Sequence, residues 1–347
     1  MAHSFFSTWV GSVSTRLFRK LSLAGIAGLL AVSAQANEPT LLNASYDVSR
    51  GFYQDYNKLF VDYWKKKTGQ TVRINQSHGG STKQARAIVD GLEADVATMN
   101  QSTDIDILAD NGLVAKEWRT LFPNNAAPYT STILFLVRKG NPKNIKDWDD
   151  LVRDGVSVII PNPKTSGNGR YSYIAAWGYA LKKNNNDEAK AREFVAKLFK
   201  NVPVLDAGGR GATATFAQRE IGDVLLTFEN EVHATIRELG SDKYEVVVPS
   251  TSILAENPVA VVTRVTERKG TTELAKAYLD YLYSDEAQEL VAQNYFRPAV
   301  QKILEKYSDR FPKLELLTVD EVAGGWKNAL AVHFADGGVF DQIYQKK

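Results

Sequence analysis

The segment VSVIIPNPKTSGNG, residues 156–169, decides the fold, because it joins a strand to a helix through a corner of threonine, serine and glycine. Valine and isoleucine over 156–160 predict a strand. Behind the corner, Ile174, Trp177 and Leu181 recur at helical spacing and predict a helix. In α/β folds that repeat this unit, ligands bind outside the carboxyl ends of the strands. We therefore predict an α/β protein whose binding site includes this corner.

Three further corners have the same composition, and each precedes a predicted helix. They read SYD at 45–47, SHGGST at 77–82 and GGRG at 208–211. The strands expected before them cover residues 41–45, 71–75 and 202–205. We expect Ser81 to be the N-cap of a helix that runs to about Leu92. Repeated units of this kind predict two lobes, each a mostly parallel sheet flanked by helices.

The length of 347 residues fits two domains of ordinary size. We predict a first lobe of residues 37–130 plus about 258–320, and a second of about 131–257 plus the C-terminal helical segment 321–347 as a lobe-spanning tail. β-Forming residues predict crossing strands near 130–138 and 256–262. Two of the four corners fall in each lobe, so we expect the ligand in the cleft between them.

The corners predict a binding site for an anion. The first N–H groups of a helix have no partner inside the helix, and the helix dipole makes that end positive. Glycine lets the backbone approach a ligand, and a hydroxyl adds a donor. Six neutral donors result: the backbone N–H groups of Asp47, Gly167, Asn168 and Gly209, and the hydroxyls of Ser81 and Ser166. Several such bonds, each contributing roughly 1.5–3 kcal/mol to a charged group, could hold a dehydrated dianion.

Charged residues beside the corners allow more than one interpretation. Arg210 either pairs with a carboxylate or supports the backbone donors from behind. Asp47 would repel an anion unless its carboxylate turns toward a basic partner such as Arg50, Arg170 or Arg210. His78 is interpreted as a packing residue or as one that supports the site without touching the ligand.

Motifs for enzymes and cofactors are poor. After residue 36 the chain has three histidines, at 78, 233 and 333, and no pair has the spacing of metal ligands. GGSTK at 79–83 lacks the spacing of a phosphate loop. We therefore expect no metal, no cofactor and no enzymatic activity. Ser81 and Ser166 could be plain helix caps, or nucleophiles of a periplasmic serine hydrolase, for which no base is in place.

The N-terminus has the pattern of a secretory signal. Arg16, Arg19 and Lys20 precede an apolar run over 21–32, and Ala-Gln-Ala follows at 34–36. The pattern predicts cleavage after Ala36, with a retained membrane anchor as the alternative. The chain contains no cysteine, which excludes disulfides, thiolate metal sites and a lipid-anchored cysteine. Together these features predict a periplasmic protein, with secretion into the medium as the alternative.

Loss of the three basic leader residues would change the net charge from +2 to −1, which argues against a nucleic-acid partner.

Several long runs carry a family resemblance. They include LLNASYD (41–47), QSHGGS (76–81), PNPKTSG (161–167), GRGAT (209–213) and HFADGG (333–338). In these runs the chain resembles the periplasmic sulfate- and thiosulfate-binding proteins, the receptors of ABC importers for oxidised sulfur. The resemblance implies a two-lobed, type II-like periplasmic-binding-protein fold that closes over a bare oxyanion. It also implies delivery to membrane permease subunits with their ATPase, and we expect a monomer.

The resemblance assigns roles position by position. The implied ligand-binding residues are Asp47, Ser81, Ser166, Gly167, Asn168, Gly209 and Phe228, with Arg210, His78 and Arg170 behind them. Phe228 stands where the sulfate-type branch has a tryptophan whose indole donates to the anion, and phenylalanine has no donor. The pocket residues therefore resemble the thiosulfate-type branch more closely. Sulfate and thiosulfate both stay open, and so do molybdate and phosphate, because Asp47 could accept a proton from phosphate.

Overall fold

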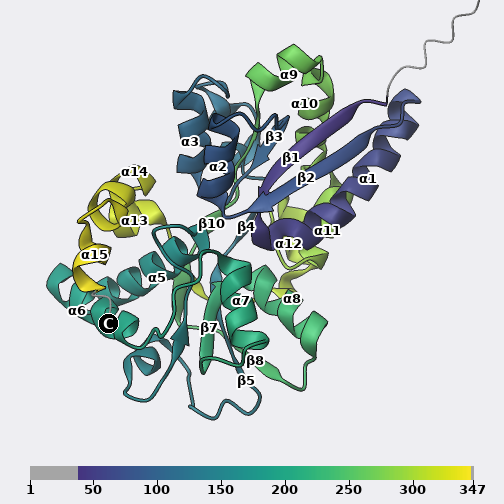
Figure 1. Cartoon of the computed structure of the whole chain (residues 1–347). Helices are drawn as coiled ribbons and strands as arrows, with labels where there is room; N and C mark the ends of the chain where they lie inside the picture. The colour runs from purple at the N-terminus through teal and green to yellow at the C-terminus, as the bar shows by residue number, and fades with distance from the viewer. Residues whose placement is uncertain (1–37, 345–347) are drawn as a thin grey trace, which may run out of the picture. The chain divides into compact units, whose positions relative to one another are not determined.

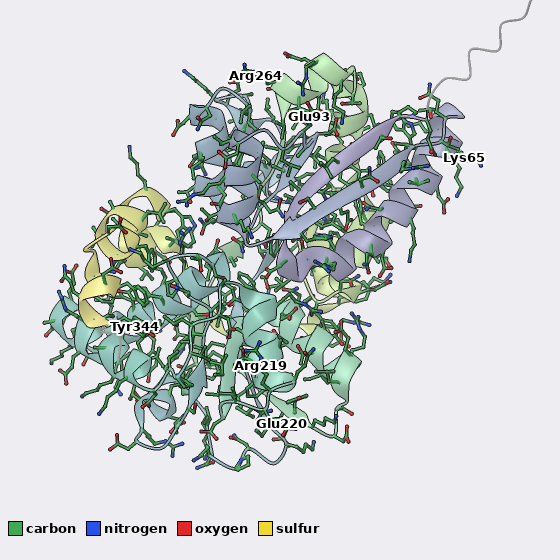
Figure 2. All side chains as sticks on the ribbon, in the orientation of Figure 1. Lys65, Glu93, Arg219, Glu220, Arg264 and Tyr344 are labelled. Atoms are coloured by element: carbon green, nitrogen blue, oxygen red, sulfur yellow. The ribbon has the colours of Figure 1, made fainter. Side chains whose placement is uncertain are left out.

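Two four-stranded sheets organise the computed structural model, which describes residues 38–344 (Figure 1). The predicted leader and its cleavage site lie outside the described residues. Charged side chains such as Lys65, Arg219 and Glu220 lie exposed (Figure 2), whereas each sheet is covered by helices. Within residues 38–344, no helix is both long enough and apolar enough to cross a membrane.

The first sheet has the strand order β11-β3-β1-β2. Its strands are β1 (Thr40–Tyr46), β2 (Arg73–Gly79), β3 (Val96–Thr98) and β11 (Val259–Val261). β1 runs parallel to β2 and β3, whereas β11 is antiparallel to β3. Ser45 stands opposite both His78 and Thr98. The carboxyl ends of three strands therefore meet at one edge of this sheet, where two of the predicted corners begin.

Helices and an aromatic cluster support the first sheet. The helices are α1 (Arg50–Thr68), α2 (Ser81–Val89), α3 (Ser102–Asp110), α9 (Thr263–Lys269), α10 (Thr272–Tyr281) and α11 (Asp285–Gln293). Helix α1 ends at Thr68, because Gly69 adopts the left-handed conformation with φ 75°. Its buried residues Phe52, Tyr56 and Phe60 pack in a row toward Tyr278 of α10. This packing fixes the direction in which the chain leaves β1.

The second sheet has the order β6-β7-β5-β8. Its strands are β5 (Ile133–Arg138), β6 (Val158–Ile159), β7 (Val224–Phe228) and β8 (Tyr244–Val247). β5 is antiparallel to both β7 and β8, and only β6 runs parallel to β7. The prediction of a mostly parallel sheet is therefore wrong here. β5 enters the sheet where β7 ends, with Ile133 opposite Phe228, so it must run against β7.

Four helices accompany the second sheet: α5 (Gly167–Lys183), α6 (Glu188–Lys200), α7 (Gly209–Ala217) and α8 (Glu229–Leu239). Helix α5 begins at the predicted corner, and most of its residues are buried. The predicted strand over 202–205 is not formed, and an irregular segment leads into α7. Val202 is buried, but its segment pairs with no strand. The fourth corner therefore follows a loop and not a strand.

Short strands connect the two sheets. β4 (Tyr129–Ser131) pairs with β10 (Ala255–Glu256) and β12 (Arg297–Pro298), and β9 (Thr251–Ile253) pairs with β13 (Glu315–Leu317). The stretch predicted as one crossing strand over 130–138 is divided at Thr132, so that β4 and β5 belong to different sheets. The chain thus passes between the sheets at β4–β5 and returns at β10–β11.

The remaining elements are short. They are α4 (Pro123–Ala126), α12 (Gln301–Lys306), α13 (Val319–Ala323), α14 (Trp326–Ala329), a π-helical turn (Leu330–Phe334), α15 (Val339–Ile343) and 3₁₀ turns at Asp47–Ser49, Trp118–Thr120, Trp148–Val152 and Ser308–Arg310. The predicted C-terminal helical segment, 321–347, is broken after α13, because Gly324 and Gly325 have φ values of 63° and 90° that end this helix.

Candidate anion-binding site

The carboxyl edge of the first sheet positions Asp47 and Ser81. Asp47 begins a 3₁₀ turn directly after β1. Ser81 is the first residue of α2, and the N-cap is Gly80, so the prediction that Ser81 caps this helix is wrong. The helix begins one residue earlier than a serine cap requires. The Ser81 hydroxyl oxygen instead accepts from the backbone N–H of Asn100, the loop residue after β3, at 3.1 Å.

Asp47 turns its carboxylate toward backbone donors. Oδ1 accepts from the N–H of Val48 at 3.0 Å, and Oδ2 accepts from the N–H of Arg210 at 3.2 Å. Burial raises the pKa of Asp47, while these backbone bonds and the nearby Arg210 charge oppose the rise. Of the three basic partners considered, the structure thus places Arg210 beside Asp47, and the bond between them comes from the Arg210 backbone. This bond joins the end of β1 in the first sheet to the start of α7.

The start of α5 has the geometry predicted for the third corner. Ser166 is the N-cap, and its hydroxyl oxygen accepts from Gly169 N–H at 3.4 Å. Within residues 38–344, the N–H groups of Gly167 and Asn168 donate to no other residue, as expected for a first helical turn. The Asn168 side chain faces inward and donates to Thr227 Oγ1 at 2.7 Å.

Glycines allow the two sheets' corners to approach closely. A Cβ atom on Gly208 would lie 2.9 Å from Asp47 Oδ2, and one on Gly209 would lie 2.9 Å from Val48 Cγ1. A Cβ atom on Gly167 would lie only 2.1 Å from Asn100 Oδ1. Such distances are far shorter than ordinary van der Waals contacts. The predicted close approach of the backbone at the fourth corner is therefore present, and it is an approach to the first-sheet side.

Phe228 lies at the end of β7 and is 1% exposed. Its ring packs edge-to-face between Tyr46 of β1, at 6.3 Å between centroids, and Tyr171 of α5, at 5.7 Å. A phenyl ring offers no hydrogen-bond donor. The side of the site that Phe228 forms is therefore apolar, and it too is built from both sheets.

The two arginines beside the corners are engaged elsewhere. Arg210 donates to the buried Glu231 at 3.1 Å, and burial raises the pKa of Glu231 to about 7 against the effect of Arg210. Arg170 is buried and donates to Pro163 O at 2.9 Å and to Thr82 Oγ1 at 3.0 Å. Burial lowers the pKa of Arg170 while the Asp104 charge raises it. Arg210 thus takes the first of its two predicted roles, pairing with a carboxylate.

His78 lies on β2, opposite Ser45 of β1. Its ring nitrogens contact Ser45 Oγ at 2.6 Å and Gln76 Oε1 at 2.5 Å. Burial, followed by the charge of Arg50, lowers the pKa of His78 to about 4, so the ring is neutral near pH 7. This environment agrees with a packing role for the ring.

Hydrogen bonds across the two sheets bring the predicted residues together. Besides the bonds of Asp47 and Arg170, Asn230 Nδ2 donates to Val48 O at 3.2 Å. Sequence reasoning missed Asn100 and Thr82, which lie at this junction. Asn100 could have been found, because it follows β3 at the same edge as Asp47 and Ser81.

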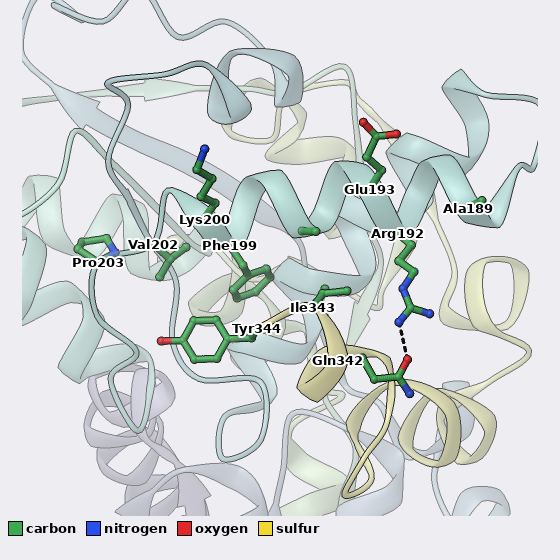
Figure 3. A pocket seen from close by; sticks show the side chains of 11 residues that line it. Ala189, Arg192, Glu193, Phe199, Lys200, Val202, Pro203, Gln342, Ile343 and Tyr344 are labelled. Carbon is green, nitrogen blue, oxygen red and sulfur yellow. Dashed lines mark hydrogen bonds between the residues drawn. The ribbon is translucent and has the colours of Figure 1, made fainter. Parts of the chain in front are cut away.

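A hollow away from the corners lies between α6 and α15 (Figure 3). Phe199 and Tyr344 lie side by side there, and Arg192 donates to Gln342. It shares no lining residue with the corners. Within residues 38–344, no group of three or more histidine or carboxylate residues is arranged to hold a metal ion.

Known proteins share this sequence and fold. A family model described as bacterial extracellular solute-binding protein matches residues 47–297. The chain belongs to this family. A thiosulfate-binding protein of Pseudomonas aeruginosa is 59% identical over 331 residues, covering 95% of this chain and 98% of that protein. A sulfate-binding protein of Escherichia coli is 57% identical, covering 92% and 97%.

A solved structure supports the fold assignment. The sulfate-binding protein SubI from Mycobacterium tuberculosis has a TM-score of 0.76 and 32% identity, and the match covers 84% of this chain and 98% of that one. The predicted resemblance to sulfate- and thiosulfate-binding proteins is confirmed, and so is the α/β fold of periplasmic solute-binding proteins.

Proposed function

We propose that this protein is the periplasmic receptor of an ABC importer and that it captures sulfate or thiosulfate. The observation that carries the proposal is that three helix starts, at α2, α5 and α7, meet at one junction, where a Cβ atom on Gly80 would lie 3.3 Å from Thr165 O and 4.0 Å from Ala207 O. The N–H groups of Gly167, Asn168 and Gly209 donate to no other residue within 38–344. Names of relatives more than half identical over nearly the whole chain support the choice of anion.

The proposed cage consists of neutral donors. Asp47, Gly167, Asn168 and Gly209 contribute backbone N–H groups, Ser81 and Ser166 contribute hydroxyls, and Phe228 lines the apolar side. Each bond to the anion contributes roughly 1.5–3 kcal/mol, so a few suffice to replace its water. Arg170 and Arg210 stay behind the cage, because their guanidinium groups already bind Thr82 and Glu231.

The proposed mechanism is closure of two lobes over the anion. We assign the lobes to the two sheets, as predicted from the sequence, with the hinge at β4–β5 and β10–β11. Asp47 and Ser81 come from the first sheet, and the other cage residues come from the second, so a bound anion stabilises the closed form. The closed form is then recognised by membrane permease subunits with their ATPase. The receptor performs no chemistry, needs no cofactor and acts as a monomer after cleavage behind Ala36.

Calorimetric titration of the purified protein tests the proposal. We expect stoichiometric binding of thiosulfate or sulfate, with no product formed. Molybdate should bind more weakly, and so should phosphate, because the cage offers few acceptors for its proton. Tighter binding of phosphate than of both sulfur anions would contradict the proposed substrate class.

A further inference from the structure

Asn100 carries a buried carboxamide that the chain itself leaves unpaired. The residue is 3% exposed, and its Oδ1 atom has no hydrogen-bond partner. Its Nδ2 atom also makes no hydrogen bond to any residue within 38–344. Buried polar groups in proteins are nearly always hydrogen-bonded, and a carboxamide has two donors and an acceptor to satisfy. Both ends of this side chain are therefore available to a bound molecule.

The carboxamide lies between two residues of the proposed cage. On one side, the backbone N–H of Asn100 donates to Ser81 Oγ at 3.1 Å. This bond occupies a lone pair of the hydroxyl oxygen, and the hydroxyl group also lies within hydrogen-bonding reach of the Asp104 carboxylate. On the other side, a Cβ atom on Gly167 would lie 2.1 Å from Asn100 Oδ1 and 2.7 Å from Nδ2. The side chain thus reaches from the end of β3 to the first turn of α5.

The ring of Phe228 offers no donor, and it packs edge-to-face against the rings of Tyr46 and Tyr171. A further side-chain donor can come from the first-sheet side, which carries both Asn100 and the Tyr46 hydroxyl. Among the described residues at this junction, Asn100 combines burial with an unpaired carboxamide.

We propose that Asn100 is a further anion-contacting residue, which donates an Nδ2–H to the bound oxyanion and helps to set its specificity. The proposal rests on the proposed function. A fully ionised anion has only acceptors, so the carboxamide must present its nitrogen to it. Because Asn100 extends from one sheet to a helix of the other, it adds this donor as the lobes close.

Two substitutions distinguish the effect of the Asn100 hydrogen-bond donor on binding from the effect of the shape of its side chain. Asn100→Ala removes the carboxamide, and Asn100→Asp keeps its size but replaces the donor by a negative charge. Each is titrated with sulfate and with thiosulfate by calorimetry, beside Asn111→Asp, an exposed control with the same charge change. We expect Asn100→Ala to weaken binding about tenfold or more. Asn100→Asp should weaken it further, since its charge repels the anion, whereas Asn111→Asp should leave it unchanged.

The outcomes distinguish this proposal from the proposed function. An unaltered protein that binds neither sulfur anion would contradict the proposed function. Binding by the unaltered protein, with Asn100→Asp as tight as the unaltered protein, would overturn only the role of Asn100, because shape alone would then account for it. Thermal unfolding of each variant checks the fold, and Asn100→Ser, a smaller polar change, replaces any variant that fails to fold.

Discussion

A backbone N–H group carries no net charge, yet several of them at helix starts can replace the water around a dianion. In this protein the nearest guanidinium groups are already engaged. Arg170 bonds to Pro163 and Thr82, and Arg210 bonds to Glu231. At the scale of single residues, the proposed site therefore depends on the position of small residues and hydroxyls.

Ser166→Ala tests this dependence. The substitution removes a proposed ligand hydroxyl and the N-cap bond to Gly169. We expect affinity for the preferred sulfur anion to fall at least about tenfold, and stability to fall by about 1 kcal/mol. Calorimetry and chemical unfolding measure the two effects separately.

Ser284→Ala is the matched control. Ser284 caps α11 in the same way, because its hydroxyl oxygen accepts from Ala287 N–H at 3.2 Å. It should lose similar stability and keep full affinity. If Ser166→Ala also kept full affinity, Ser166 would be a cap and nothing more.

At the scale of elements, strand–corner–helix order predicted which segments meet. β1 extends one residue beyond its predicted range at each end, and α5 begins at the predicted corner. The strand expected over 202–205 is absent. The apolar side chain of Val202 is buried there, and a side chain can be buried without strand pairing of its backbone. Local sequence patterns also could not predict the direction of β5, because this direction depends on where the crossing chain enters the second sheet.

The candidate site was predictable to a similar degree. Corner composition located Asp47, Gly167 and Gly209 at helix or turn starts. It could not show that Asn100 contacts Gly167, because that contact joins two sheets. It also misplaced the cap of α2 by one residue, since glycine and serine are both acceptable there.

Gly167→Ala tests the contact between β3 and α5. The added methyl group would collide with the Asn100 carboxamide, so the two sheets could not approach as closely. We expect anion affinity to fall by more than tenfold, while thermal stability of the anion-free protein changes little.

Gly51→Ala serves as the control for the glycine substitution, because a Cβ atom there meets nothing within 4 Å. It should not weaken binding. If Gly167→Ala bound the anion as tightly as Gly51→Ala, the close approach would not be needed for binding.

At the scale of the whole molecule, a buried histidine, His333, couples the stability of the protein to pH. His333 in the π-helical turn contacts Tyr173 Oη at 3.0 Å, and burial lowers its pKa to about 4. An unfolded histidine titrates near 6.5, so between these values the unfolded chain binds more protons. Near pH 7 the buried His333 therefore does not lower the free energy of unfolding. As the pH falls from 6.5 to 4, it lowers this free energy progressively.

His333→Gln should make the protein less sensitive to acid. We expect the loss of unfolding free energy between pH 7 and pH 4.5 to be smaller by about 2 kcal/mol than in the unaltered protein. Urea unfolding at the two pH values measures this difference. Tyr173→Phe, which removes the partner and keeps the histidine, should retain most of the original pH dependence. An equal loss in His333→Gln and the unaltered protein would refute the coupling.

The glycines at 80, 167 and 208 face atoms that belong to the half of the molecule built on the opposite sheet. A side chain at any of them meets its obstacle only when the two halves come together. A selection that scores expression or solubility would therefore tolerate alanine there, whereas growth on a limiting sulfur source would eliminate it. The constraint at these positions would be visible only to an assay that requires the molecule to move.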